Sequence, residues 1–446
     1  MEPLTVGLYG LAATLVMLAL RVPIAAALGT AAAAGIFVIF AWRPGQPFVA
    51  EWAWQPTFSL LANNPYAFIT SYTLSTIPLF IFMGHLAYEA GFTTDIYRAA
   101  RLWLARLPGG VAMASVVGCG GFSAITGSSV ACAAAMGRIA IPEMLRFGYA
   151  RSLAAGSVAI GGTLGSLIPP SVLFILYGIF AEQSIAKLFI AAILPGILSL
   201  AAYLVVIYIW VRLRPGAAPI PDEEITRAER MRALKDCWAI ITLFVVVVGG
   251  IYVGLFTPTE AAGMGAAATL VLGVVLGRLK LAGIYAALKD SVYQSSMIFV
   301  IAIGGKLFVN FIALTGLAGD ITAWIETSGV SVFMVMGFIV VMYIFLGMFL
   351  DPIGIILLTL PLTIPIVETF GFSLIWFGVV VIKLLEIGLV TPPIGLNVFV
   401  IKSIVGDRVP LESIFGGVAW FLLIEIFVLA AIIAVPWISL FLVGFV

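Results

Sequence analysis

Two short segments of the sequence place a proline pair and oxygen-bearing side chains inside an apolar run. They are GTLGSLIPPS at 162–171 and IGLVTPPIGL at 387–396. A proline within a helix has no N–H to donate, and it leaves carbonyls about one turn earlier that an apolar environment cannot satisfy. Carbonyl and hydroxyl oxygens are the ligands that hard cations prefer. The two segments therefore predict broken helices that bind a cation such as sodium.

A second kind of polar segment precedes each proline pair. In GCGGFSAITGSSVACAAAMG at 118–137, 16 of 20 residues are Gly, Ala, Ser, Thr or Cys. Small residues allow close helix packing, and a polar turn in the middle is typical of a re-entrant hairpin buried in protein. A tightly packed single span is the alternative. The matching segment GMFLDPIG at 347–354 is also interrupted, at Asp351 and Pro352, and this favours two hairpins.

Each hairpin tip is predicted to face the broken helix of its own half and to form one cation site with it. The predicted sodium-binding residues are Ser128, Ser129, Gly165, Ser166, Pro169, Ser171, Asp351, Gly388, Thr391 and Gly395. The amino-terminal ends of broken helices also favour an anion nearby. The candidate residues for binding an anionic substrate are Arg138, Pro170, Pro393 and Asn397. Of these, Asn397 either lines the substrate cavity or packs in the core.

Composition indicates what kind of scaffold positions these residues. Hydrophobic residues make up 63% of the 446 positions, charged residues make up 10%, and the mean hydropathy is +1.21. Apolar runs of the roughly 20 residues that a membrane-spanning helix needs recur along the chain, without the two-residue alternation of a β-barrel. The fold class is therefore an all-α polytopic membrane protein. The net charge of +1 indicates no nucleic-acid partner, and the three cysteines lack metal or redox spacing.

The chain contains an internal repeat. A single offset of 223 residues matches Pro142 with Pro365, Gly148 with Gly371, Gly165 with Gly388, and the pair Pro169-Pro170 with Pro392-Pro393. Residues 1–211 are predicted to form the first repeat and residues 237–446 the second, with a polar cytoplasmic linker at 212–236 that contains a short helix. Apart from a hairpin at 110–145, the spans predicted in the first repeat are 4–20, 24–41, 66–91, 150–180 and 187–211. An odd number of crossings inserts the second repeat upside down, and such inverted repeats are typical of secondary transporters.

The distribution of charge sets the predicted orientation. With the linker in the cytoplasm, 17 of the 22 Lys and Arg residues lie on the cytoplasmic side and both termini are periplasmic. The charged helix at 95–107 is predicted to lie along the membrane interface, with a weaker counterpart at 279–290, and 42–65 is the longest outer loop. The first apolar run is interpreted as a retained helix and not as a cleaved signal. Three basic residues are left at membrane depth: Arg138, Lys306 and Lys383.

Several acidic residues and one histidine also lie within apolar runs. Carboxylates are costly in lipid and are functional candidates for that reason. They are Glu143, Glu260, Glu386 and Glu425. Glu260 and Glu386 flank proline breaks, where a structural cap is the alternative to a functional role. His85, the only histidine, is predicted to pack in the core or to join two helices by a hydrogen bond in preference to relaying protons.

The motifs FSAITGSS, IPEM, GTLGSLIPPS, PGIL, FTPTEAA and TPPIGLNVFV together resemble the DctM-type large membrane subunit of tripartite ATP-independent periplasmic (TRAP) transporters. The resemblance covers nearly the whole chain. It implies an elevator-type transporter in the bacterial inner membrane that is not an enzyme and has no cofactor besides sodium as the coupling ion. It also implies two protein partners, a small four-helix membrane subunit (DctQ type) and a periplasmic substrate-binding protein (DctP type). The implied substrates are organic acids, such as four-carbon dicarboxylates or sialic acid.

Three other functions are weighed against this one. A self-sufficient sodium and carboxylate symporter is the main alternative, and uptake by the chain alone would distinguish it. An intramembrane serine protease built on TGSS would need a base beside the serine, and His85 is the only histidine available. A passive channel is disfavoured because two broken-helix sites indicate occluded binding.

Overall fold

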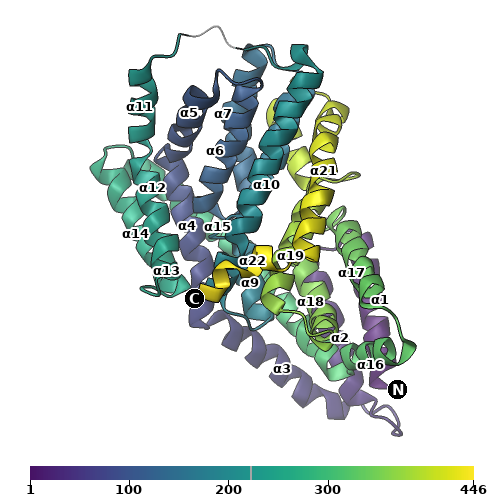
Figure 1. Ribbon diagram of the computed structural model, residues 1–446. Coiled ribbons are helices and arrows are strands. Elements are labelled where there is room, and N and C mark those ends of the chain that lie inside the picture. The colour runs from purple at the N-terminus through teal and green to yellow at the C-terminus, as the bar shows by residue number, and fades with distance from the viewer. Residues whose placement is uncertain (221–223, 446) are drawn as a thin grey trace.

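The computed structural model describes residues 1–220 and 224–445, and these form helices and connecting loops without a β-strand (Figure 1). The all-α fold class is thereby confirmed. Residues 221–223, which belong to the predicted linker, and the last residue lie outside the described part. Six described helices are long and apolar enough to cross a membrane, and three bent helix pairs raise this number to nine if each pair is one span.

The first half contains paired helices, an interrupted segment and one long helix. Its helices are α1 (Pro3–Ala19), α2 (Ile24–Ala41), α3 (Glu51–Ile69), η1 (Tyr72–Ser75), α4 (Thr76–Glu89), α5 (Phe92–Leu104), α6 (Gly110–Thr126), α7 (Ser129–Arg146), α8 (Arg151–Leu167), α9 (Val172–Phe180), α10 (Ile185–Leu213) and η2 (Pro215–Ala217). The predicted short helix of the linker is α11 (Arg227–Asp236), which begins with a capping box formed by Thr226 and Glu229.

The second half presents a similar order of elements. They are α12 (Trp238–Phe244), η3 (Val245–Gly249), α13 (Gly250–Tyr252), α14 (Pro258–Val275), α15 (Leu281–Thr315), α16 (Leu317–Ser328), α17 (Val332–Gly347), α18 (Pro352–Thr369), α19 (Leu374–Gly388), α20 (Leu396–Val405), η4 (Gly406–Arg408), α21 (Leu411–Ala434), α22 (Trp437–Leu440) and η5 (Leu442–Phe445). In the view of Figure 1 the end of α10 and the linker helix α11 reach the top, whereas α3 and the start of α1 lie at the bottom.

The chain reverses direction at both predicted hairpin tips. The backbone N–H of Val111, at the start of α6, donates to the hydroxyl of Tyr149, which follows the end of α7 (3.3 Å). In the second hairpin Thr359 donates to the hydroxyl of Tyr343 (2.7 Å), and these residues lie eight positions either side of Asp351. The two arms of each hairpin therefore run antiparallel to one another.

The two proline pairs end their helices as predicted. Helix α8 stops at Leu167 and α9 begins at Val172, with a bend of 40° between them. Helix α19 stops at Gly388 and α20 begins at Leu396. Both Pro-Pro peptide bonds are cis. In each half, a broken helix thus follows directly after a hairpin.

Two groups of helices can be distinguished by their contacts, and they share part of one hydrophobic core. Helix α15 packs along α2, α3 and α4, and α14 packs on α4, so these form one group with α1. The other group is built around α8, which packs on α6, α7 and α21, and it includes both broken helices. The first hairpin and both broken helices belong to this second group, whereas α18 of the second hairpin packs on α15 as well as on α19. The segments that carry Ser129, Ser166 and Glu386 therefore all belong to the second group.

The structure corrects three details of the sequence interpretation. The predicted outer loop at 42–65 is wrong for most of its length, because α3 occupies Glu51–Ile69. The predicted span at 66–91 is interrupted at 70–71, where the chain bends by 55° between α3 and the segment that contains α4. The predicted interfacial helix at 279–290 is the beginning of the 35-residue helix α15. Residues 281–315 thus form one continuous helix, whereas 51–89 are divided at 70–71.

Candidate functional site

The tip of the first hairpin packs directly on the first broken helix. Gly127 forms the tip with φ +62°, a left-handed conformation that favours glycine, and Ser128 caps α7 by accepting from the N–H of Ala131. A Cβ atom on Gly165 would lie 2.6 Å from the carbonyl oxygen of Ser128. Glycine at 165 is therefore required for the tip to approach α8 so closely.

This close approach brings three oxygen-bearing side chains together. The hydroxyls of Ser129 and Ser166 lie 2.6 Å apart, and the Ser129 hydroxyl donates to Oε1 of Glu386 at 2.7 Å. All three side chains are buried. The second carboxylate oxygen of Glu386 has no hydrogen-bond partner among the described residues. We call Ser129, Ser166 and Glu386 the oxygen cluster; hydroxyl and carboxylate oxygens at this spacing suit a hard cation.

The oxygen cluster joins the two halves of the chain, because Glu386 belongs to α19 whereas the serines belong to α7 and α8. A second contact across the halves lies at Asn397 in α20, whose side-chain amide donates to the carbonyl of Ala159 in α8 (3.5 Å). The side-chain oxygen of Asn397, Oδ1, is buried without a described partner, and so is the hydroxyl of Ser171. Two further buried oxygens of the broken helices are thus left for a ligand to satisfy.

The second predicted cation site is arranged differently. Asp351 caps α18 by accepting from the N–H of Gly354 (3.2 Å). The hydroxyl of Thr391 donates to the carbonyl of Ile387, within its own segment (2.6 Å). Gly388 makes its close approach to Gly347, where a Cβ atom would lie 2.6 Å from the opposing Cα. Among the described residues no hydrogen bond joins Asp351 to 391–395.

A buried ion pair lies one helical turn from the oxygen cluster. Lys383 Nζ is 2.6 Å from Glu425 Oε2 and donates to the hydroxyl of Ser199 at 2.8 Å. Both charged side chains are 1% exposed. The pair connects α19 to α21 and α10. Each charged residue can be identified from the sequence within its apolar run. The pairing cannot be predicted, because 42 residues separate the two.

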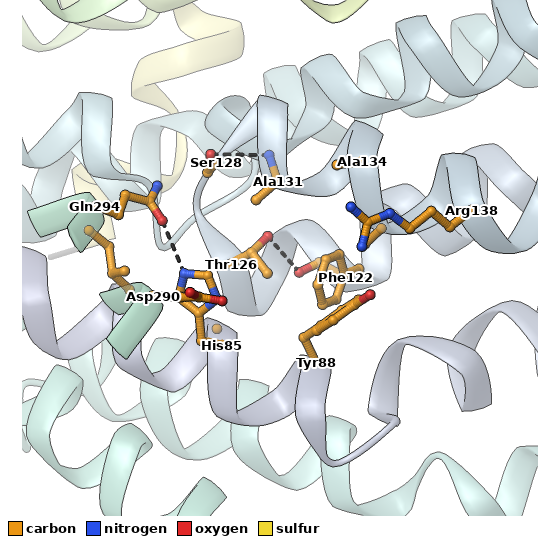
Figure 2. Close-up of a pocket in the computed structure, with 13 residues that line it drawn as sticks. His85, Tyr88, Phe122, Thr126, Ser128, Ala131, Ala134, Arg138, Asp290 and Gln294 are labelled. Atoms are coloured by element: carbon orange, nitrogen blue, oxygen red, sulfur yellow. Dashed lines mark hydrogen bonds between the residues drawn. The ribbon is translucent and has the colours of Figure 1, made fainter. Parts of the chain in front are cut away.

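A cavity of about 190 Å³ lies where the first hairpin faces the other helix group. Figure 2 shows His85 of α4 in a hydrogen bond with Gln294 of α15, which is 3.1 Å long, and Ser128 and Arg138 of the hairpin opposite them. Asp290 lies beside His85 at the cavity wall. Arg138 forms no ion pair with any residue in the described part of the chain. Its guanidinium is therefore available to an anion that enters the cavity.

The four candidate substrate residues lie in different surroundings. Arg138 lines the cavity, whereas Asn397 is buried against α8. Pro170 is buried beneath the hairpin tip, where its carbonyl oxygen would lie 2.6 Å from a Cβ atom on Gly127. Pro393 is exposed. Of the four, Arg138 is the one placed in the cavity beside Ser128.

Two residues have the structural partners that the sequence offered as alternatives. Glu260 forms a capping box with Thr257, accepting from its backbone N–H at 2.8 Å and from its hydroxyl at 2.9 Å. The histidine joins two helices, as described above. Glu143, in the hairpin arm, pairs with Arg101 of α5 (3.3 Å) and lies 3.8 Å from Arg146. These side chains therefore have partners outside the oxygen cluster.

The comparison with known proteins identifies the family. A model of the DctM component of tripartite ATP-independent periplasmic transporters matches residues 11–438. The chain belongs to this family. Membership confirms, at the level of the family, the transport function that the motifs implied. Members of this family are multi-pass membrane permease subunits and not enzymes.

The chain is similar to several named members of the DctM family. It is 34% identical to the C4-dicarboxylate TRAP transporter large permease protein DctM of Pseudomonas aeruginosa, over 83% of this chain and 86% of that protein. It is 32% identical to the sialic acid TRAP transporter large permease protein SiaM of Vibrio cholerae, over 82% and 85%. The isethionate TRAP transporter permease protein DctMQ of Oleidesulfovibrio alaskensis is 31% identical, over 99% of this chain and 67% of that protein.

A solved structure shows a similar fold. The YdaH transporter of Alcanivorax borkumensis matches with a TM-score of 0.62, at 14% identity, over 98% of both chains. At this identity the likeness concerns the fold alone. It agrees with the all-helical arrangement of the large permease.

Proposed function

We propose that this large permease imports an organic acid across the bacterial inner membrane by coupling its movement to sodium. The observation that carries the proposal is the oxygen cluster of Ser129, Ser166 and Glu386, buried where the first hairpin and both halves meet. A buried carboxylate with one unpartnered oxygen is costly unless a cation compensates it. Sodium, as a hard cation, fits such oxygen donors.

The substrate binds in the cavity between the first hairpin and the other helix group. Arg138 and Ser128 supply a guanidinium and a hydroxyl on the hairpin side, and His85 and Gln294 supply hydrogen-bonding groups opposite. A guanidinium binds carboxylates in a bidentate manner. Relatives named for C4-dicarboxylate and sialic acid support a carboxylate as the substrate.

The movement is of the elevator type, and the two repeats are inverted. The first hairpin and the broken helices form one packed group, and the cavity lies at its boundary with the group of α15, so sliding of this group past α15 would carry the substrate. The linker is cytoplasmic and both termini are periplasmic. In support of this topology, the positive charges of the sequence concentrate on the side that the linker defines.

Transport also depends on two partners, a small four-helix membrane subunit and a periplasmic binding protein. The relative named permease protein DctMQ extends beyond the region matched by this chain, which leaves space for an additional module in that protein. The alternative, a self-sufficient sodium and carboxylate symporter, is tested in the same experiment. Proteoliposomes that contain the chain alone should show no sodium-driven succinate uptake, and addition of the small subunit and the loaded binding protein should restore it.

The sodium assignment is tested by Glu386→Gln. The amide can still accept from Ser129 but removes the charge, so the sodium concentration for half-maximal uptake should rise about tenfold, which corresponds to about 1.4 kcal/mol. Glu326→Gln is the matched control, because Glu326 is exposed on α16. Unchanged sodium dependence in a folded Glu386→Gln protein would remove the oxygen cluster from the coupling site.

A further inference from the structure

A second cavity, of about 460 Å³, lies at the bend between α3 and α4 and has both apolar and polar lining residues. Its wall is formed by Asn64 of α3, Ser71 and Thr73 at the bend, Gln183 after α9, and Lys306 of α15. None of these residues belongs to the oxygen cluster or to the cavity of Arg138. The proposed function leaves this cavity unexplained.

Lys306 is the basic residue of this wall, and it is unpaired. It forms no hydrogen bond or ion pair with any residue of the described ranges. A lysine in the interior of an apolar helix is costly and is a functional candidate for that reason. The surrounding amide and hydroxyl groups can donate hydrogen bonds, so the wall favours an anion. Glu182 is the acidic residue of the wall, and its side chain is exposed.

The position of this cavity relates it to the substrate cavity. Lys306 and Gln294 are 12 residues apart on α15, which places them about 18 Å apart along the helix axis at 1.5 Å per residue. Both cavities lie where the group of α15 faces the group that carries the first hairpin. Figure 1 shows α3, which lines the Lys306 cavity, at the end of the molecule opposite the linker.

We propose that the Lys306 cavity is a separate anion site that takes a carboxylate group of the substrate on the side opposite the linker, before the substrate reaches Arg138. The proposal rests on the proposed function for the direction of movement and for the substrate class. Lys306 attracts the carboxylate by charge, and Asn64, Thr73 and Gln183 offer hydrogen bonds. A substrate delivered at this end would then find a positive group at each of two levels along α15, with Lys306 of α15 at the first and Arg138 of α7, opposite Gln294, at the second.

The test uses a cysteine placed in the wall, Thr73→Cys, in the full chain in phosphatidylcholine nanodiscs. Its rates of reaction with an anionic and a cationic methanethiosulfonate reagent are compared, using the chain with its native cysteines as the baseline. With Lys306 present the anionic reagent should be favoured, and millimolar succinate should slow its reaction compared with chloride at the same ionic strength. Lys306→Gln should reduce the ratio of anionic to cationic rate about three- to tenfold and remove the succinate effect.

Two control variants separate charge from folding. Lys306→Arg should keep both the ratio and the succinate effect. Lys187→Gln, at the start of α10 and outside the cavity wall, should leave both unchanged. An unaltered ratio in Lys306→Gln, or labelling that succinate does not slow, would overturn the proposal. If phosphatidylglycerol in the nanodiscs slowed the reaction of Thr73→Cys with the anionic reagent while succinate had no effect, the anion would be a lipid headgroup. That result would also overturn the proposal.

The labelling needs neither sodium nor the partner proteins, so its outcome is independent of the uptake experiment. If succinate protects Thr73→Cys while sodium-driven uptake fails, the proposed function is wrong and the anion site stands. If uptake is sodium-driven while protection is absent, the anion site is wrong and the proposed function stands.

Discussion

The two hairpin tips occupy equivalent positions in the repeat but carry different chemistry. At the offset of 223 residues, Ser128 corresponds to Asp351, and both side chains cap the second helix of their hairpin. The next position is Ser129 in the first hairpin and Pro352 in the second. At the first tip, the hydroxyl of Ser129 can therefore contact the broken helix. At the second tip, the charged residue Asp351 is itself the helix cap.

The broken helices differ in a complementary way. Ser166 of α8 corresponds to Leu389, and Thr163 of α8 corresponds to Glu386 of α19. The first site thus has the hydroxyls, and it obtains its carboxylate from the second half. The two sites therefore differ although their backbones are equivalent. The second half supplies the carboxylate of both, Glu386 to the first site and Asp351 to the second.

The largest effect is expected on stability, from breaking the buried ion pair between Lys383 and Glu425 beside the oxygen cluster. Lys383→Met leaves Glu425 buried without its partner, which should cost about 3–5 kcal/mol of the free energy of unfolding. The melting temperature of the purified chain in detergent measures this loss. Replacing both residues, by Lys383→Met with Glu425→Gln, should restore most of the stability, since no unpaired charge remains. If Lys383→Met alone were as stable as the parent protein, the ion pair would not be needed to hold α19 against α21.

Much of this arrangement is predictable from the sequence because its signals are local. Proline pairs, glycines and capping residues mark where helices break, and both hairpin tips and both broken helices lie where these signals place them. Helix α3 was missed because its sequence, EWAWQPTFSLLANNPYAFI, contains two prolines and several polar residues and resembles a loop. The oxygen cluster has no local signal, because 257 residues separate Ser129 from Glu386 and their contact depends on packing between the halves.

A smaller effect, on the sodium dependence of uptake, should show whether Asp351 is a sodium ligand or only a helix cap. Asn is as good a helix cap as Asp, so Asp351→Asn keeps the cap and removes the charge. If Asp351 binds sodium, as we propose for the second site with Thr391, the sodium concentration for half-maximal uptake should rise several-fold, by up to about tenfold. Thr391→Val should act in the same direction. Sodium dependence that stays the same in both variants would leave Asp351 as a cap alone and confine coupling to the first site.

The smallest effect is expected at Glu260, which flanks a proline as Glu386 does but lies in a capping box with Thr257. Its carboxylate accepts from the backbone and side chain of Thr257 and contacts no residue of the oxygen cluster. Glu260→Ala should lower the melting temperature only slightly, through loss of the bonds that its carboxylate accepts from Thr257. Glu260→Gln should retain part of the cap, and neither variant should change the sodium dependence of uptake. A shift in sodium dependence at Glu260 comparable to that at Glu386 would contradict the distinction between them, because it would give a carboxylate in a cap the role assigned to the buried oxygen cluster.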